Sequence, residues 1–395
     1  MNVEYEFLSE TPIENVITCL NFRFDKVVCF GYTDTVKRMK KMTKEFLQTD
    51  CGVAEVLFVQ IKQYDLQGIA EQIRTQVRED RKAGSKIFFD ATGGASLLQI
   101  AFGMLSAELR IPIHNYDVAK GKLHLLQPLS GGTLPETVQP GKVKLNLDLM
   151  IRMHGGRIAP RRKKKDFPTT DIREIEDESF RAMIPKLWSV VKANREAWPQ
   201  FSAFLKKTGT AANLLRYEMP TETALGFIRG IQETHPSFTP KLLKSIMEYC
   251  SEQGVFSEYR WSANKSKLSF TYASSAVKKC MIDTGSILEL HAGEEESRQT
   301  DDCRVGVRID WDGVLHDNPD KDVENEIDVL SLKGYILCFT SCKIGRVGRD
   351  ALYELATVAN RFGGEYTKKR LVIARDLTET ERLRAEEMGI EVVKA

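Results

Sequence analysis

Residues 325–343 (NEIDVLSLKGYILCFTSCK) bring two carboxylates, a hydroxyl and an ammonium group into one short stretch. Glu326 and Asp328 are two residues apart, and Ser341 and Lys343 have the same spacing. Side chains two residues apart point to the same face of a β-strand. If each pair lies on its own strand of a hairpin, the four groups meet. Such a set can hold a hard divalent cation and polarise a phosphate group beside it.

The order of apolar residues predicts the hairpin itself. In residues 325–332, Ile327 and Val329 alternate with the two carboxylates, which is the period of a half-buried strand. Gly334 lies in a two-residue break, and glycine permits the positive φ that a hairpin turn needs. Residues 335–343, rich in aromatic and β-branched types up to Thr340, predict the return strand.

The elements around the hairpin must position these groups. A helical segment at residues 274–291 carries Glu289 near its end, and Gly363 follows the helix expected after the hairpin. Thr378-x-x-Glu381 is a capping box that opens a later helix. The expected order is α-β-β-β-α-β followed by α-β. After the helix at 274–291, the expected elements are strands at 304–311, 325–332 and 335–343, a helix at 348–362, a strand at 370–375, the capped helix and a strand at 390–393.

Strands and helices alternate in the first part of the chain. This alternation predicts a doubly wound parallel sheet. A further hairpin strand is expected within residues 118–127, with its turn at Lys120-Gly121. The expected strands are 3–8, 26–30, 54–61, 86–89 and 112–116, and the expected helices are 12–20, 35–47, 66–82 and 96–109.

In such a sheet, ligands bind beyond the carboxyl ends of the strands, where the strand order reverses. Residues 9–12 (SETP) follow the first strand, with Pro12 at a favoured helix-start position. Residues 90–94 (DATGG) follow the fourth, and Ala95 and Ser96 open the next helix. Glycines let the backbone approach a ligand, and free N–H groups at a helix start bind anions. A simple connecting turn remains the alternative for either loop alone, and the absence of G-x-G-x-x-G disfavours a dinucleotide site.

The C-terminal third resembles the PD-(D/E)xK nuclease core, and the whole chain is similar to the CARF-domain nucleases. The nuclease motif falls on Glu289 as the helix acid, Asp328 as the strand aspartate and Lys343 as the motif lysine. Ser341 departs from the motif because it stands where the family has an acid. Glu326 or a water molecule would have to compensate for it.

The same resemblance extends to the N-terminal loops. Thr92-Gly93-Gly94 matches the Thr-Gly-Gly of the sensor loop, whereas Ala95-Ser96 replace the Thr-Lys of many relatives and remove one phosphate contact. The resemblance implies that this loop and the first one bind cyclic oligoadenylate. The implied ligand-binding residues are Ser9, Glu10, Thr11, Pro12, Ile13, Thr33, Asp90, Thr92, Gly93, Gly94 and Ser96.

The resemblance implies an ancillary effector of type III CRISPR antiviral defence: a metal-dependent nuclease that cyclic tetra-adenylate switches on and that cuts DNA and also RNA. Glu289, Glu326 and Asp328 would hold Mn²⁺ or Mg²⁺, and Lys343 would orient the attacking water or stabilise charge on the phosphate. A ring of repeated nucleotides implies a matching two-fold receptor, so a homodimer is expected.

The chain of 395 residues divides into four expected parts. Residues 1–140 form the Rossmann-like (CARF) sensor, 141–170 a connector, 171–272 a helical and winged-helix-like middle region, and 273–395 the nuclease domain. The basic run Arg161–Lys165 in the connector is either a solvated linker or a phosphate-contacting arm. Four ribbon residues of the middle region could touch nucleic acid, although packing between domains is the favoured role: Arg260, Trp261, Lys265 and Lys267.

Composition limits the class of protein. With 42% hydrophobic and 28% charged residues, the chain has an ordinary globular composition, and its net charge of +2 gives no overall attraction for nucleic acid. The eight cysteines contain no Cys-x-x-Cys pair, which indicates reduced thiols. The acidic N-terminus lacks an apolar signal region, and no segment suits a membrane span. A cytoplasmic location is expected.

Two other functions remain open. One is a ligand-responsive DNA-binding regulator with an inactive nuclease fold, and Ser341 in place of an acid favours it. The other is a constitutive repair or restriction nuclease whose first domain is only a scaffold. Taken singly, acidic residues on a hairpin are more often a solvated face.

Overall fold

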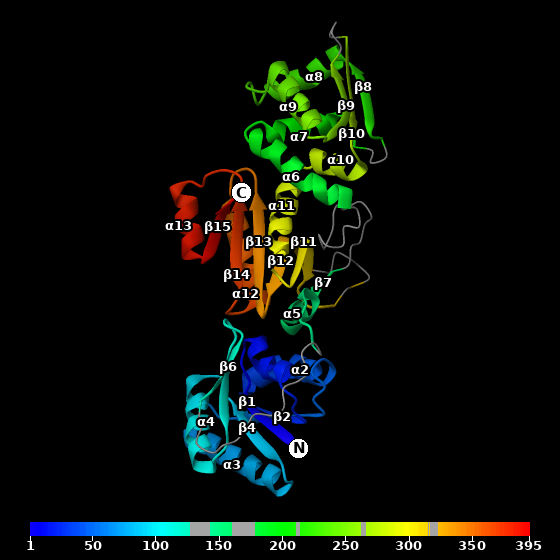
Figure 1. The fold of residues 1–395 in the computed structure, drawn as a ribbon. Helices are drawn as coiled ribbons and strands as arrows, with labels where there is room; N and C mark the ends of the chain where they lie inside the picture. The colour runs from blue at the N-terminus through cyan, green and yellow to red at the C-terminus, as the bar shows by residue number, and fades with distance from the viewer. Residues whose placement is uncertain (127–142, 160–177, 211–213, 262–265, 315, 317–322) are drawn as a thin grey trace.

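The computed structural model describes residues 1–126, 143–159, 178–210, 214–261, 266–314, 316 and 323–395. Three lobes follow one another along a long axis: an N-terminal lobe, a middle lobe and a helical lobe (Figure 1). The chain leaves the middle lobe after β7 (Arg157–Ile158) and returns to it at α11 (Ser286–Ser297). The helical lobe is therefore an insertion between two parts of the middle lobe.

The N-terminal lobe contains a six-stranded sheet of order β3-β2-β1-β4-β5-β6. Strands β1 to β5 are parallel and β6 is antiparallel to β5. This confirms the predicted alternation of strands and helices and places the order reversal between β1 and β4. The elements are β1 (Asn2–Phe7), the 3-10 helix η1 (Pro12–Asn15), α1 (Ile17–Asn21), β2 (Lys26–Tyr32), α2 (Thr33–Thr49), β3 (Glu55–Ile61), α3 (Leu66–Lys82), β4 (Lys86–Asp90), α4 (Ser96–Leu109), β5 (Ile113–Asp117) and β6 (Lys122–Leu125).

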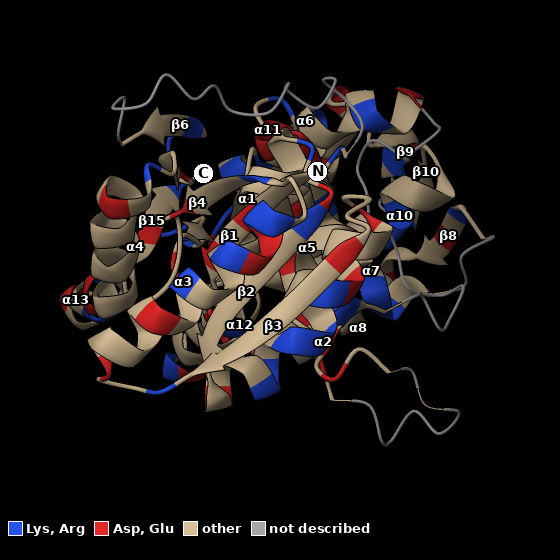
Figure 2. Ribbon diagram, turned by 90° about the horizontal axis from the view of Figure 1, so that it is seen from below, with Lys and Arg blue, Asp and Glu red and all other residues tan. Residues whose placement is uncertain are grey.

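Strand β1 has two chemically different faces. Tyr5 and Phe7 are buried on one face, where Phe7 lies 4.0 Å from Phe102 of α4 between ring centroids. Glu4 and Glu6 alternate with these aromatic residues, and both are also buried. A strand with buried carboxylates opposite an aromatic core is unusual, because charged groups are rarely buried without partners. Figure 2 shows basic and acidic residues interspersed along the elements in view.

The middle lobe contains a six-stranded sheet of order β15-β14-β13-β12-β11-β7. Strands β13, β14 and β15 are parallel, and the other pairs are antiparallel. Part of the expected connector belongs to this lobe, because β7 is its edge strand. The basic run at 161–165 lies outside the described residues. The remaining elements are α5 (Leu147–Met153), β11 (Asp302–Asp310), β12 (Glu324–Lys333), β13 (Ile336–Lys343), α12 (Arg349–Gly363), β14 (Lys368–Ile373), α13 (Glu379–Glu387) and β15 (Ile390–Lys394).

The helical lobe packs helices against a three-stranded sheet of order β8-β10-β9. The ribbon expected to carry Arg260, Trp261 and Lys267 forms two antiparallel strands, β9 and β10. Strand β8 lies in a stretch expected to be helical; Tyr217 alternates there with Arg216 and Glu218, which is the period of a strand. Lys265 lies outside the described residues. The elements are α6 (Glu178–Ala193), α7 (Trp198–Thr208), β8 (Arg216–Pro220), α8 (Thr221–Gln232), α9 (Pro240–Glu252), β9 (Phe256–Trp261), β10 (Lys267–Tyr272) and α10 (Ser275–Ile282).

The expected single helix at residues 274–291 is wrong: the structure has two helices, α10 and α11, separated by a turn. Asp283 accepts hydrogen bonds from the N–H of Gly285 and from Ser286 Oγ, which favours a turn over a continued helix. Glu289 therefore lies in the first turn of α11 rather than near a helix end. Within the described residues, no helix is long and apolar enough to cross a membrane.

Candidate functional site

The two hairpin strands separate where the polar residues begin. Strand β12 pairs with β11 from Glu324 to Leu332. Its pairing with β13 is shorter and ends at Val329, opposite Thr340. Asp328 and Ser341 are the first residues beyond this last pair. The two strands thus form a fork, and backbone N–H groups of β13 become available to the side chain of Asp328.

Asp328 binds three groups of β13 through one oxygen. The N–H of Cys342 donates to its Oδ2 over 2.6 Å, and Ser341 Oγ donates to the same atom over 3.1 Å. Lys343 Nζ lies 3.7 Å from that oxygen. The structure therefore brings together three of the residues predicted from their spacing. Ser341 acts here as a hydrogen-bond donor to Asp328.

Glu289 reaches the same fork from α11, and its carboxyl group is half-buried. The pKa of Glu289 is raised from 4.5 to about 8, chiefly by burial and also by the negative charges of Asp328, Asp283 and Glu326, whereas Lys343 lowers it. These charges establish that the helix acid and the hairpin groups share one electrostatic environment. At neutral pH the carboxyl group is mostly protonated unless a cation compensates its charge.

The pKa of Glu289 predicts a pH-dependent stability. Because the folded pKa is above the unfolded value, the folded state binds the extra proton, and stability falls as pH rises from 4.5 to about 8. In chelator, wild-type protein should lose thermal stability over this window relative to Glu289→Gln, which cannot ionise. The two unfolding temperatures, measured in steps of pH, should converge again when Mn²⁺ is added. Parallel pH profiles in chelator would contradict this assignment.

Glu326 lies further out than the sequence prediction placed it. It is exposed, and Arg308 Nε lies 3.7 Å from its Oε2 on the neighbouring strand β11. Within the described part of the chain, the three potential ligand residues whose ligand atoms all approach within 4.8 Å are Glu4, Asp90 and His114. The carboxylate oxygens of the predicted set, Glu289, Glu326 and Asp328, therefore do not all lie within 4.8 Å of one another.

The loops after β1 and β4 pack directly against each other. A Cβ atom on Gly93 would lie 3.0 Å from Ser9 Cβ and 3.1 Å from Glu14 Cβ, so only glycine fits there without a shift. Asn15 closes the first loop: its Oδ1 accepts from the N–H of Ser9 over 2.7 Å, and its Nδ2 donates to Ser9 O over 2.9 Å. Thr11 N–H donates to Ser9 Oγ. The two predicted ligand loops form one continuous surface.

Several predicted ligand-binding residues instead hold the loop in place. Asp90 Oδ1 accepts from the N–H of Thr92 over 2.7 Å and from Thr92 Oγ1, and that hydroxyl accepts from the N–H of Tyr116. Asp90 and Thr92 are buried, so their side chains point inward. Gly94 has a φ of +91°, and a Cβ atom there would lie 2.5 Å from Phe7 Cβ. Internal packing, and not ligand approach alone, requires this glycine.

The other predicted ligand residues divide by exposure. Pro12 and Ile13 are buried within the lobe. Glu10, Thr33 and Ser96 are exposed, and Glu10 binds an arginine of α2. The exposed three lie at the start of η1, α2 and α4, beyond the carboxyl ends of the strands. Their exposed side chains are accessible to a bound molecule.

Two tyrosines of the middle lobe contact the N-terminal lobe, and the sequence analysis missed both. Tyr366 Oη donates to Glu14 Oε1 over 2.7 Å, immediately beside the ligand loops. Tyr335, in the turn between β12 and β13, accepts from Asn21 Nδ2 over 3.0 Å and lies 3.3 Å from Tyr116 Oη. These partners are far apart in sequence, and an unexplained tyrosine in a hairpin turn was the only signal for them.

No family profile and no curated protein matches the sequence. The solved structures that are similar to it include two that cover its whole length. A protein from Vibrio cholerae, VC1899, has a TM-score of 0.66 at 15% identity, covering 100% of this chain and 94% of that one. Can2 from Sulfobacillus thermosulfidooxidans, in complex with cyclic tetra-adenylate, has a TM-score of 0.62 at 15% identity, covering 100% and 95%. The chain shares the full-length fold of these two proteins.

Proposed function

We propose that this protein is a metal-dependent nuclease of the CARF-domain type, which cyclic oligoadenylate activates in type III CRISPR defence. The observation that carries the proposal is the fork, in which Asp328 faces Ser341 and Lys343 while Glu289 approaches from α11. The order α11-β11-β12-β13-α12-β14 is the one expected for a PD-(D/E)xK core. The likeness to Can2, whose structure contains cyclic tetra-adenylate, supports the nature of the activator.

The donor set fits a hard divalent cation. Asp328 and Glu289 supply carboxylate oxygens, the ligands that Mg²⁺ and Mn²⁺ prefer, and a bound cation would compensate the charge of the largely buried Glu289. Asp328 would be the principal ligand, Glu289 the second, and Glu326 an outer contributor. The ion would lower the pKa of a water molecule and neutralise charge on the phosphate.

The chain's own residues have separate parts in hydrolysis of a phosphodiester. The N–H of Cys342 and Ser341 Oγ fix the orientation of Asp328, because both donate to its Oδ2. Lys343 carries a positive charge at the same end of the fork and would stabilise charge on the phosphate as it develops. Glu289 would be ionised with a cation bound beside it. The proposed substrate is DNA, with RNA as a second substrate.

Ser341 should limit the affinity of this site for magnesium. Ser341→Asp would add a carboxylate beside Asp328, so the Kd for Mg²⁺ should fall at least ~10-fold, whereas unfolding in chelator should occur at a lower temperature. Ser341→Asn is the control, because asparagine has the size of aspartate without its charge. It should neither tighten Mg²⁺ binding nor lower the unfolding temperature in chelator in this way. Titration calorimetry and thermal unfolding in chelator measure the two quantities. An unchanged Mg²⁺ affinity in Ser341→Asp would mean that position 341 faces away from the ion.

The activator would act through two unequally bound global states. We place it on a homodimer axis against the exposed edge of the two loops, because a ring of repeated nucleotides has matching symmetry. The contacts of Tyr366 with Glu14, and of Tyr335 with Asn21, connect those loops to the middle lobe. Through these contacts, a movement of the loops would change the arrangement of the fork in each protomer of the dimer.

Loss of one inter-lobe contact should weaken this coupling. A single hydrogen bond contributes about 1 kcal/mol, so Tyr366→Phe should lower the ratio of stimulated to unstimulated cleavage about 5-fold. Tyr353→Phe is the control, because Tyr353 is an exposed residue of α12. Cleavage rates with and without cyclic tetra-adenylate give the ratio for each variant. Equal ratios in Tyr366→Phe and Tyr353→Phe would show that the contact transmits nothing.

A regulator with an inactive nuclease fold is the second candidate, favoured by the open arrangement of the three carboxylates and by Ser341. A labelled oligonucleotide distinguishes the two. Metal-dependent shortening of the oligonucleotide supports the nuclease. An intact oligonucleotide whose affinity for the protein changes with cyclic tetra-adenylate supports the regulator.

A further inference from the structure

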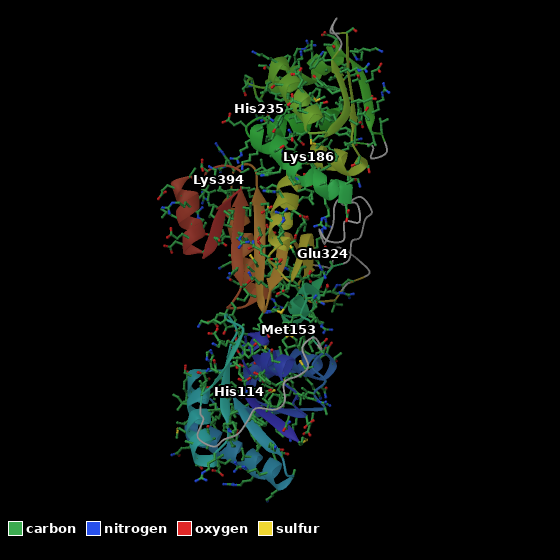
Figure 3. All side chains as sticks on the ribbon, viewed as in Figure 1. His114, Met153, Lys186, His235, Glu324 and Lys394 are labelled. Carbon is green, nitrogen blue, oxygen red and sulfur yellow. The ribbon has the colours of Figure 1, made fainter. Side chains whose placement is uncertain are left out.

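A second group of chemically reactive side chains lies inside the N-terminal lobe, far from the fork. Glu4 of β1, Asp90 of β4 and His114 of β5 are on three neighbouring strands, and Asp90 stands opposite both Glu6 and His114 in the register. Glu4, Asp90 and His114 are 0%, 1% and 0% exposed. Figure 3 marks His114 within this lobe. Such groups are rarely buried unless they are paired or bind a metal.

The imidazole of His114 is left without hydrogen bonds. Within the described residues, neither ring nitrogen has a hydrogen-bond partner, and Glu4 Oε1 also lacks one. His114 Nε2 lies 3.5 Å from Glu4 Oε1 and 3.8 Å from Asp90 Oδ2. These separations are longer than ordinary hydrogen bonds between nitrogen and oxygen. Three polar groups therefore converge on one point at separations of 3.5 and 3.8 Å from the imidazole nitrogen.

The separations match the edges of a metal coordination polyhedron. Zinc binds histidine nitrogen and carboxylate oxygen at about 2.0–2.2 Å, so two ligands of a tetrahedral ion are about 3.4 Å apart. The three ligand atoms of Glu4, Asp90 and His114 all lie within 4.8 Å of one another, so a small contraction would complete the arrangement. Cys19 Sγ lies 2.9 Å from the other oxygen of Glu4.

The two carboxylates are already held by a surrounding layer of hydrogen bonds. Thr18 Oγ1 donates to Asp90 Oδ2 over 2.5 Å, and the N–H of Thr92 donates to Asp90 Oδ1. Cys19 Sγ donates to Glu4 Oε2. Outer hydrogen bonds of this kind orient the ligands of protein-bound metals.

The charges in the cluster also call for a cation. Three buried carboxyl groups, those of Glu4, Glu6 and Asp90, share their surroundings with the single imidazole of His114. We propose that Glu4, Asp90 and His114 bind a divalent transition-metal ion, with zinc as the first expectation because histidine and carboxylate ligands in this geometry suit it. This site is distinct from the fork in the middle lobe.

Such an ion would stabilise the two loops from behind. Asp90 is bonded to Thr92 of the second loop and to Thr18 of α1, which follows the first loop. A metal ion joining Asp90 to Glu4 and His114 ties both loops to three strands of the sheet. The metal is thus structural, and its presence does not depend on any nuclease activity.

Metal analysis of untagged, full-length protein tests the site. The parent is Asp328→Asn, which removes a carboxylate of the fork so that the fork contributes little metal. His114→Gln in this background removes one proposed ligand. His154→Gln in the same background is the control, since His154 is a buried histidine of the middle lobe. After dialysis, the parent and the control should retain about one zinc per chain, and His114→Gln at least ~10-fold less, as expected for loss of a ligand.

Cobalt(II) provides a readout that does not require the His114 variant to fold. Chelator-treated parent protein should give the strong visible absorption of tetrahedral cobalt when Co²⁺ is added, and Zn²⁺ should abolish it by competition. Zinc at equal, substoichiometric levels in all three proteins, together with no such absorption in the parent, would overturn the proposal. The cluster would then be a network of buried groups neutralised by protons.

Discussion

Asp328→Ala should lower metal-dependent cleavage at least ~100-fold, in the range found for removal of single catalytic groups. The variant loses the carboxylate that the fork orients with two hydrogen bonds. Lys343→Ala should give a loss of similar size for a different reason, because it keeps the metal ligand and removes the charge beside the phosphate. The two variants should therefore differ in metal affinity: weakened in Asp328→Ala and nearly unchanged in Lys343→Ala.

Asp350→Ala is the matched control for this experiment, because Asp350 is an exposed acid in the first turn of α12. Initial rates on a labelled oligonucleotide and calorimetric Mn²⁺ titrations give both quantities. Unfolding temperatures check that Asp328→Ala, which leaves the N–H of Cys342 without its acceptor, is still folded. Cleavage at the wild-type rate in either folded variant would remove the fork as the active site.

Gly94→Val should abolish the response to cyclic tetra-adenylate. The φ of +91° is strained for any L side chain, and the new Cβ atom would overlap Phe7 Cβ at 2.5 Å, so the loop after β4 must move. A ~100-fold stimulation requires the ligand to favour the active state by roughly 2.7 kcal/mol, and a displaced loop forfeits that difference. Ligand affinity and ligand-stimulated cleavage should therefore fall together.

Gly103→Val separates loop geometry from the general effect of replacing a glycine in this region. Gly103 lies in α4, and a Cβ atom there meets nothing within 4 Å. This control should bind cyclic tetra-adenylate and respond to it like wild type. Mn²⁺ affinity should be unchanged in both variants, since the fork is in another lobe. A normal ligand response in Gly94→Val would mean that the Thr-Gly-Gly loop is a simple connection and that the ligand binds elsewhere.

Local patterns in the sequence predicted the elements and the fork well. Glu326 and Asp328 alternate with Ile327 and Val329, and Gly334 terminates the strand, so the hairpin was visible from period and turn chemistry. The meeting of Asp328, Ser341 and Lys343 followed from the hairpin alone. The break between α10 and α11 was missed because the competing turn depends on side-chain hydrogen bonds of Asp283.

Features that depend on tertiary structure could not be predicted in this way. The inward direction of Thr92 depends on a hydrogen bond from the N–H of Tyr116 in the next strand, and that of Asp90 depends on Thr92 and Thr18. Spacing places Glu4 on one face of β1 but does not say that this face is buried against His114. The contact of Tyr366 with Glu14 joins two lobes, and no local period reports such a pair.

Cleavage of a labelled DNA oligonucleotide in Mn²⁺, with and without cyclic tetra-adenylate, tests the central claim most directly. Wild-type protein and Asp328→Ala are compared under identical conditions. The account predicts strong cleavage by wild type with the activator, at least ~10-fold less without it, and near-background cleavage by Asp328→Ala in both cases. Equal wild-type cleavage with and without the activator, or none in either case while cyclic tetra-adenylate binds, would contradict the account.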